Sequence, residues 1–193
     1  MKKILSVILC SVLLFTLTAC GQAETKNENN SKEIVKEDTK EVNTAAKGEE
    51  EKTKSREVVL YFSDDQAMYL VGEKRSLENP TAKSIVAELV KGPSAQSETK
   101  LYETLPNDLE VIDVQVKDDI ATVDFKSSAT EKISGGSTGE GMALYSIINT
   151  LILDKELGIT KVQFLVEGKN VESIKGHYDV TEPMLSDIGK IKK

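Results

Sequence analysis

The sequence is poor in the side chains that most often carry chemistry. It has no tryptophan, one histidine, two cysteines and 5% aromatic residues among its 193 residues. A single histidine leaves little from which to build a histidine-based metal site or a Ser-His-Asp triad. The lack of tryptophan leaves few flat rings on which a sugar could stack. These shortages count against histidine-dependent hydrolases and against carbohydrate-binding modules.

The first twenty residues have the features of a secretory signal. Lys2 and Lys3 precede a mostly apolar run over 4–17, shorter than the ~20 apolar residues of a membrane-spanning helix. Its length is typical of the ~7–15 residue centre of a signal peptide. Leu17-Thr18-Ala19-Cys20 follows and resembles the bacterial lipobox, in which a small residue precedes an obligatory cysteine.

The lipobox resemblance implies that Cys20 carries a diacylglyceryl group and becomes the N-terminus after cleavage behind Ala19. Residues 1–19 are then a lipoprotein signal peptide, and the lipid on Cys20 anchors the protein to the outer face of the cytoplasmic membrane. Cys10 lies in the removed segment, so no free thiol is left for a disulfide within the chain, for catalysis or for a metal. The alternatives are an ordinary signal peptide and an uncleaved anchor helix.

Composition divides the rest of the chain into a linker and a domain. Residues 20–56 hold the lipidated cysteine and a stretch rich in Glu, Lys, Asn and Thr without aromatic residues. Such a stretch cannot bury enough apolar surface to offset its ordering entropy, so we expect it to be disordered. Residues 57–193 are long enough for one ordinary domain. The formal net charge of −7 argues against nucleic acid as a partner.

Hydrophobic patterns in this domain predict an α+β fold. The expected strands are 58–62, 68–71, the two arms of a hairpin over 109–125, 161–167 and a short return strand at 171–174. The expected helices run from Asn79-Pro80 to Gly92-Pro93 and from about Gly139 to Asp154, with a loop over 126–138 and a frayed tail from Gly189. We expect a small, mainly antiparallel sheet with the two helices packed on one face.

Three groups of polar side chains are candidate sites, and each has a structural alternative. Asp118 and Asp119 could pair for acid–base work, but they sit at a predicted hairpin turn, where Asp is a common residue. Asp64 and Asp65 could bind calcium weakly, although two carboxylates alone make a poor site. His177 could be a ligand or a base, but a structural hydrogen bond is the commoner role of a lone loop histidine. We therefore predict no catalytic residue, no metal site and no cofactor.

Several segments of the domain, taken together, resemble the GerMN domain of sporulation and spore-germination proteins. The matching segments are 59–62, 69–71, 85–93, 101–106, 116–125, 145–151 and 162–168. Together they cover nearly all of residues 57–185. The hairpin turn of the family usually has glycine where this chain has Asp119, and Asp tolerates the left-handed backbone of such a turn.

This resemblance implies a non-enzymatic module similar to ring-building modules, which pack a small sheet with two helices and can oligomerise. It implies envelope or sporulation proteins, and a possible second copy of the chain, as partners. We predict the partner surface at Tyr102 and Pro106, apolar residues in a loop after a helix end. A peptidoglycan-binding module is the alternative. A cell-wall hydrolase is less well supported, because it needs two carboxylates ~5–10 Å apart in a cleft.

Overall fold

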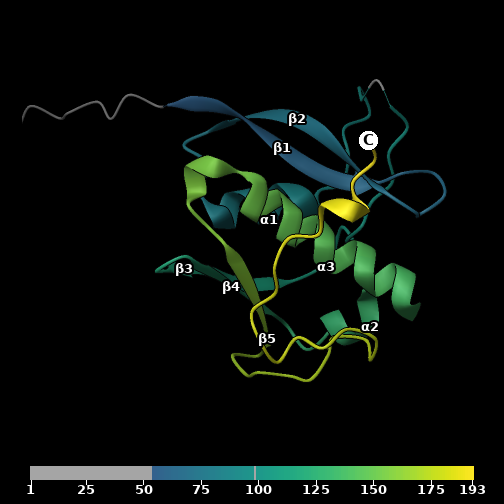
Figure 1. Cartoon of the computed structure of the whole chain (residues 1–193), viewed down its shortest axis with the longest axis vertical. Coiled ribbons are helices and arrows are strands. Elements are labelled where there is room, and N and C mark those ends of the chain that lie inside the picture. The colour runs from purple at the N-terminus through teal and green to yellow at the C-terminus, as the bar shows by residue number, and fades with distance from the viewer. Residues whose placement is uncertain (1–53, 98) are drawn as a thin grey trace, which may run out of the picture. The chain divides into compact units, whose positions relative to one another are not determined.

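The computed structural model describes residues 54–97 and 99–193, and the strands of this part form two sheets (Figure 1). The strands are β1 (Ser55–Ser63), β2 (Leu70–Glu78), β3 (Val111–Lys117), β4 (Ile120–Phe125) and β5 (Lys161–Val166). β1 and β2 form an antiparallel hairpin, whereas β4 pairs antiparallel with β3 and parallel with β5. The predicted α+β class is confirmed, with two sheets in place of the one expected.

The two main helices lie between these sheets (Figure 1). The helices are α1 (Ala82–Val90), α2 (Ala129–Lys132) and α3 (Gly136–Leu153), with 3-10 turns η1 (Lys155–Leu157) and η2 (Ile188–Lys190). α3 contacts β1 of one sheet and β5 of the other, and α1 contacts β1 and β3. The helical period of this segment predicts that four residues face the sheet, and all four are fully buried: Leu144, Ile147, Ile148 and Leu151. Contact with both sheets explains why α3 is apolar around most of its circumference.

The core is completed by alternate residues of the central strands. Phe125 of β4 and Phe164 of β5 are fully buried, and their rings stack with centroids 5.9 Å apart. Leu60 and Phe62 of β1 enclose the helices from the other sheet. The alternating pattern of 161–167 predicts that Val162, Phe164 and Val166 point inward, and all three are buried.

The first helix begins later than predicted. Its N-cap is Thr81, whose Oγ1 accepts the Ser84 N–H at 3.2 Å while the Thr81 N–H donates to Ser84 Oγ at 2.9 Å. Asn79, the expected cap, has a φ of 43° and its side chain accepts the Lys54 N–H at 2.8 Å. Asn79 thus closes the end of the β1–β2 hairpin. The predicted stop is confirmed, since Gly92 follows the helix with a φ of 79°.

The first hairpin is longer than its hydrophobic pattern indicates. β2 continues through the charged residues 72–78, and β1 begins at Ser55, two residues inside the predicted linker. The register is continuous from Ser55↔Glu78 to Ser63↔Leu70. The pairing of the two strands therefore extends beyond their apolar residues. Cys20 and the predicted signal peptide lie outside the described residues.

The second hairpin exposes more apolar surface than expected. The alternating pattern predicts that Ile112, Val114 and Val116 of the first arm point inward, together with Ala121, Val123 and Phe125 of the second. The three residues of the second arm and Val114 are buried, while Ile112 is 38% and Val116 45% exposed. An irregularity in the register between Val111 and Asp113 disturbs the alternation, and β3 is an edge strand. The left-handed residue of the turn is Asp118 rather than the predicted Asp119.

Two C-terminal predictions were wrong. Residues 171–174 form no strand, and the expected frayed tail is docked on the domain. Ile191 bridges to Leu70 at the edge of β2, and the Lys192 N–H donates to the Leu70 carbonyl at 2.8 Å. The fully buried Asn149 side chain donates to the Asp187 carbonyl and accepts the Asp187 N–H, both at 3.0 Å. These backbone hydrogen bonds hold the tail against the domain. The loop expected over 126–138 also contains α2 and the first residues of α3.

Candidate functional site

Asp118 and Asp119 have structural roles in the turn of the second hairpin. The Asp119 carbonyl accepts the Thr160 N–H at 2.8 Å, and the Asp119 carboxylate is hydrogen-bonded to the Thr160 hydroxyl. These bonds tie the turn to the segment that leads into β5. The structural interpretation of Asp118 and Asp119 therefore accounts for their positions.

Asp64 organises the loop between β1 and β2. Its buried carboxylate accepts the N–H groups of Met68 at 2.9 Å and Tyr69 at 3.3 Å. Burial raises the pKa of Asp64, but these hydrogen bonds and the Lys192 ammonium outweigh it and hold the pKa below its usual value. Asp65 is exposed. Among the described residues, no three His, Cys, Asp or Glu side chains gather where they could hold a metal ion.

His177 makes a structural hydrogen bond to a buried carboxylate that the sequence did not reveal. Glu140, near the start of α3, has no exposed surface. It accepts the N–H groups of Lys175 and His177, each at 2.8 Å, and of Ile174 at 3.2 Å. His177 Nδ1 lies 3.2 Å from the same carboxylate. Glu140 therefore fixes the loop after β5. The sequence feature that could have indicated this role of Glu140 is an acidic residue within an otherwise apolar helical segment.

The loop predicted as a partner surface is only partly exposed. Tyr102 exchanges two backbone hydrogen bonds with Ser63 of β1, at 2.9 and 3.1 Å, and its side chain is 40% exposed. Lys100 Nζ lies 5.3 Å from the centre of the Tyr102 ring. Pro106 is half-buried, and its neighbour Leu105 belongs to the core. Tyr102 is thus the main apolar group that this loop presents to a partner.

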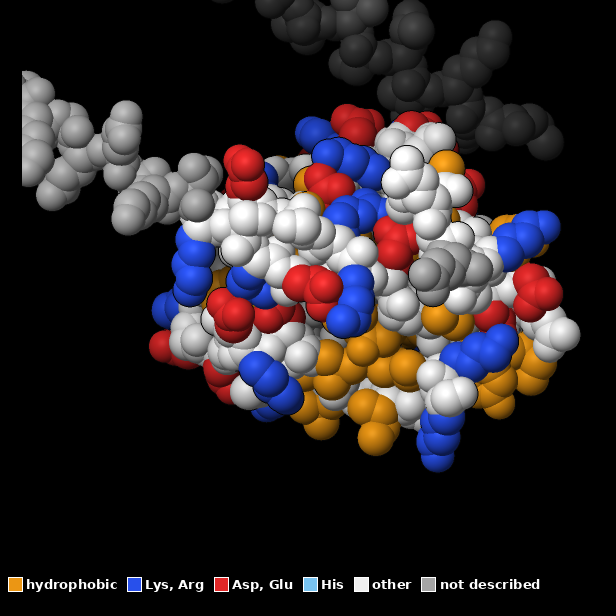
Figure 2. Space-filling model, turned by 90° about the horizontal axis from the view of Figure 1, so that it is seen from above, with side chains coloured by type: hydrophobic (Ala, Val, Ile, Leu, Met, Phe, Trp, Pro, Cys, Tyr) orange, Lys and Arg blue, Asp and Glu red, His pale blue; other side chains and the backbone are white. Residues whose placement is uncertain are grey.

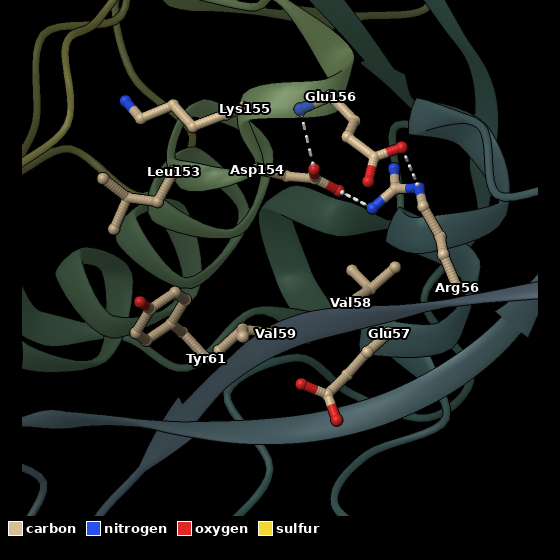
Figure 3. A pocket seen from close by; sticks show the side chains of 9 residues that line it. All are labelled: Arg56, Glu57, Val58, Val59, Tyr61, Leu153, Asp154, Lys155 and Glu156. Carbon is tan, nitrogen blue, oxygen red and sulfur yellow. Dashed lines mark hydrogen bonds and ion pairs between the residues drawn. The ribbon is translucent and has the colours of Figure 1, made fainter.

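A second candidate is a groove between β1 and the C-terminal end of α3, here called the β1 groove (Figure 3). Its volume is about 270 Å³, and its apolar lining includes Val59, Tyr61 and Leu153. Burial raises the pKa of the Tyr61 hydroxyl. The groove is a shallow hollow beside a strand edge.

One end of the β1 groove is held by an ion-pair network (Figure 3). Arg56 of β1 reaches Asp154 at 2.8 Å and Glu156 at 3.4 Å. The Arg56 side chain is 14% exposed and that of Asp154 8%. This network links β1 to the residues that follow α3, so the two walls of the groove are fixed relative to one another.

Exposed apolar side chains also gather elsewhere, and Figure 2 shows one face on which such side chains lie beside lysines. Met68, Leu185 and Ile188 are 58%, 62% and 69% exposed. Met68 lines a hollow together with Lys190, whose Nζ lies 4.9 Å from the centre of the Tyr145 ring. The tail therefore contributes apolar surface as well as backbone pairing.

The described part includes no helix with the length and apolarity needed to cross a membrane.

Two small sheets around two central helices define the class of this domain, which is that of GerMN domains. The tandem GerMN domains of the sporulation protein GerM from Bacillus subtilis match with a TM-score of 0.54 and 22% identity, over 73% of this chain and 48% of that chain. The first GerMN domain of that protein matches with a TM-score of 0.51 and 22% identity, over 68% of this chain and 97% of that chain. The chain thus spans about half the length of the tandem structure.

Sequence comparison identifies the family. The model of the Germane family, described as sporulation and spore germination, matches residues 59–172. This match covers more than half of the chain, and the chain belongs to the Germane family. A search of curated proteins finds no match.

Proposed function

We propose that the protein is an extracytoplasmic lipoprotein, held by Cys20 at the outer face of the cytoplasmic membrane. Its GerMN domain is a non-catalytic module that assembles with envelope proteins during sporulation or germination. The family match over 59–172 carries this proposal. The lipobox-like sequence before Cys20 supports the anchor.

The surface of the domain supports a role in binding proteins. Tyr102 and the apolar groups of the tail are exposed, and those of the β1 groove are half-buried, in a domain whose polar clusters are explained by loop and turn structure. Partly exposed aromatic and aliphatic side chains are the groups that most often anchor protein interfaces.

The anchor is tested by labelling cells with radioactive palmitate and fractionating them. We expect wild type to take up label and sediment with membranes, and Cys20→Ser to lose both properties. Cys10→Ser is the matched control, because Cys10 lies in the predicted signal peptide, and it should behave as wild type. Label retained by Cys20→Ser would contradict the anchor.

The assembly role is tested by affinity capture from detergent-solubilised membranes of sporulating cells, with mass spectrometry of the captured proteins. We expect wild type to recover sporulation or envelope proteins and Tyr102→Ala to recover less of them. Capture of none, together with sedimentation on purified peptidoglycan, would replace the proposal with the cell-wall binding alternative.

A further inference from the structure

Within the described residues, part of the β1 backbone that faces the β1 groove has no hydrogen-bond partner. Ser63 exchanges both of its backbone hydrogen bonds with Tyr102, so its N–H and C=O point away from β2. Residues of an antiparallel pair alternate in direction, and the β1–β2 register has no shift. Tyr61, Val59 and Glu57 must therefore also direct their backbone groups away from β2.

The Tyr61 N–H confirms this alternation, because it donates to the Thr150 hydroxyl of α3 at 3.1 Å. The described residues supply no such partner on this side for the N–H groups of Glu57 and Val59. α3 ends at Leu153, so beyond Tyr61 the edge of β1 faces the β1 groove instead of a helix (Figure 3). An edge with free donors and acceptors is a template for another strand.

The same sheet already pairs with extended segments at its other end. Tyr102 joins the edge of β1 at Ser63, and Ile191 joins the edge of β2 at Leu70. Both edges of the sheet are thus paired near the β1–β2 loop, whereas no segment of residues 54–97 or 99–193 pairs with the β1 edge along Glu57–Val59. Glu57 and Val59 lie on the same edge of β1 as Ser63, which pairs with Tyr102.

We propose that the β1 groove binds an extended peptide segment of a partner protein, which adds to β1 as a further strand at Glu57–Val59. Backbone groups that alternate along an edge are matched by the backbone of a strand, which carries donors and acceptors at the same spacing. A β-branched side chain of this segment fits over Val59, Tyr61 and Leu153, the apolar lining of the groove.

Charge favours a basic segment. The groove is lined by three carboxylates and two cations, which are Glu57, Asp154, Glu156, Arg56 and Lys155. Glu57 pairs with Lys74 at 2.9 Å and Glu156 with Arg56 at 3.4 Å, but their side chains are 59% and 61% exposed. A lysine or arginine beside the β-branched residue can therefore reach the same carboxylates from solvent. This inference rests on the proposed function only in treating the domain as a protein-binding module. It does not depend on the lipid anchor.

The test measures amide hydrogen exchange by NMR on residues 20–193 carrying Cys20→Ser. The probe is the peptide acetyl-Lys-Val-Thr-Val-Thr-Lys-amide. In the free protein, Glu57 and Val59 should exchange at least about 10-fold faster than Val58 and Leu60, which point toward β2. Saturating peptide should slow Glu57 and Val59 by about 10-fold and leave Leu60 unchanged.

Variants separate the backbone from the side-chain contribution. Val59→Pro removes one edge donor that the fold does not use, and Leu153→Lys places a positive charge in the apolar lining, where it repels a basic segment. Both should weaken binding about 10-fold or more. Ile112→Lys, which changes an exposed apolar residue on β3, should not.

Three results would overturn the proposal. Slow exchange of Glu57 and Val59 in the free protein would mean that the chain itself or a second copy occupies the edge. No slowing at millimolar peptide, or equal slowing in the Val59→Pro and wild-type proteins at Glu57, would mean that no strand is added there. None of these results depends on membrane fractionation, so failure of the groove and failure of the anchor are distinguishable.

Discussion

Glu140 Oε2 accepts the backbone N–H of His177 at 2.8 Å and lies 3.2 Å from the Nδ1 atom of the same residue. One carboxylate near the start of α3 thus holds a loop that follows the last strand. The Glu140 side chain has no exposed surface, so water cannot replace it as an acceptor for these groups.

Glu140→Gln should destabilise the domain by about 1–3 kcal/mol. Some of the backbone N–H groups that donate to Glu140 would lose their charged acceptor in a buried site. The measurement is the urea midpoint of unfolding with an unchanged m-value. Glu182→Gln removes a carboxylate from an exposed position and is the control. Equal midpoints for the two variants would contradict the anchoring role of Glu140.

Arg75→Met should destabilise the domain by about 3 kcal/mol, because breaking a largely buried ion pair leaves the other charge without a partner. Arg75 contacts the Glu73 and Glu88 carboxylates and donates to the Gly92 carbonyl at 3.1 Å. Lys74→Met is the matched control at the neighbouring residue, since Lys74 pairs with Glu57 on the exposed side. Its thermal midpoint should stay close to that of wild type.

Gly141→Ala should destabilise the domain although alanine favours helices. An added Cβ would lie 2.5 Å from the Tyr178 hydroxyl oxygen, so the ring would have to move. Overpacking of this kind costs about 1–3 kcal/mol. Tyr178 also stacks edge-on with Tyr145, at a centroid distance of 5.9 Å.

A double-mutant cycle of Gly141→Ala with Tyr178→Ala checks the cause by calorimetry. The cost of Gly141→Ala should disappear or reverse when the Tyr178 ring is absent, since only the helix preference of alanine remains. Additive effects of the two substitutions would show that the clash with Tyr178 is not the reason.

Asp113 should titrate far below an ordinary aspartate. Hydrogen bonds from Gln115 and Lys83, then from the Val114 N–H, lower the pKa of Asp113 from 3.8 to about 2. Because its folded pKa is depressed, the stability that Asp113 contributes is complete above 3.8 and is lost as the pH falls toward about 2. Carboxyl NMR titration measures this directly.

Lys83→Ala should raise the pKa of Asp113 toward 3.8, because the variant removes the ammonium that lies 2.9 Å from the carboxylate. The difference in urea midpoint between wild type and Asp113→Asn should also shrink as the pH is lowered from 3.8 to about 2. An unchanged titration in Lys83→Ala would assign the shift to Gln115 and Val114 alone.

The sequence predicted the parts of the fold that depend on regular patterns. The buried face of α3, the inward residues of β5 and the stop at Gly92 follow from hydrophobic period and backbone preference. Thr81 replaced Asn79 as the helix cap because Asn79 is used to close the β1–β2 hairpin at Lys54. Such competition between two local roles is decided by tertiary contacts.

Features that depend on distant partners were missed. The charged half of β2 is a strand because β1 lies beside it, and the tail is ordered because Asn149 and Leu70 offer it hydrogen bonds. Glu140 could not be assigned a role, since its donors lie more than thirty residues away along the chain. The β1 groove likewise joins residues 56–61 to 153–156, and no short motif marks it.

The docked tail has a practical consequence for handling this protein. Lys192 pairs with Leu70 and its ammonium lies 3.7 Å from Asp64, so an affinity tag fused directly behind Lys193 would begin against the β1–β2 loop. A bulky C-terminal fusion would displace the tail from this contact. Binding measured with such a fusion would then reflect an altered surface.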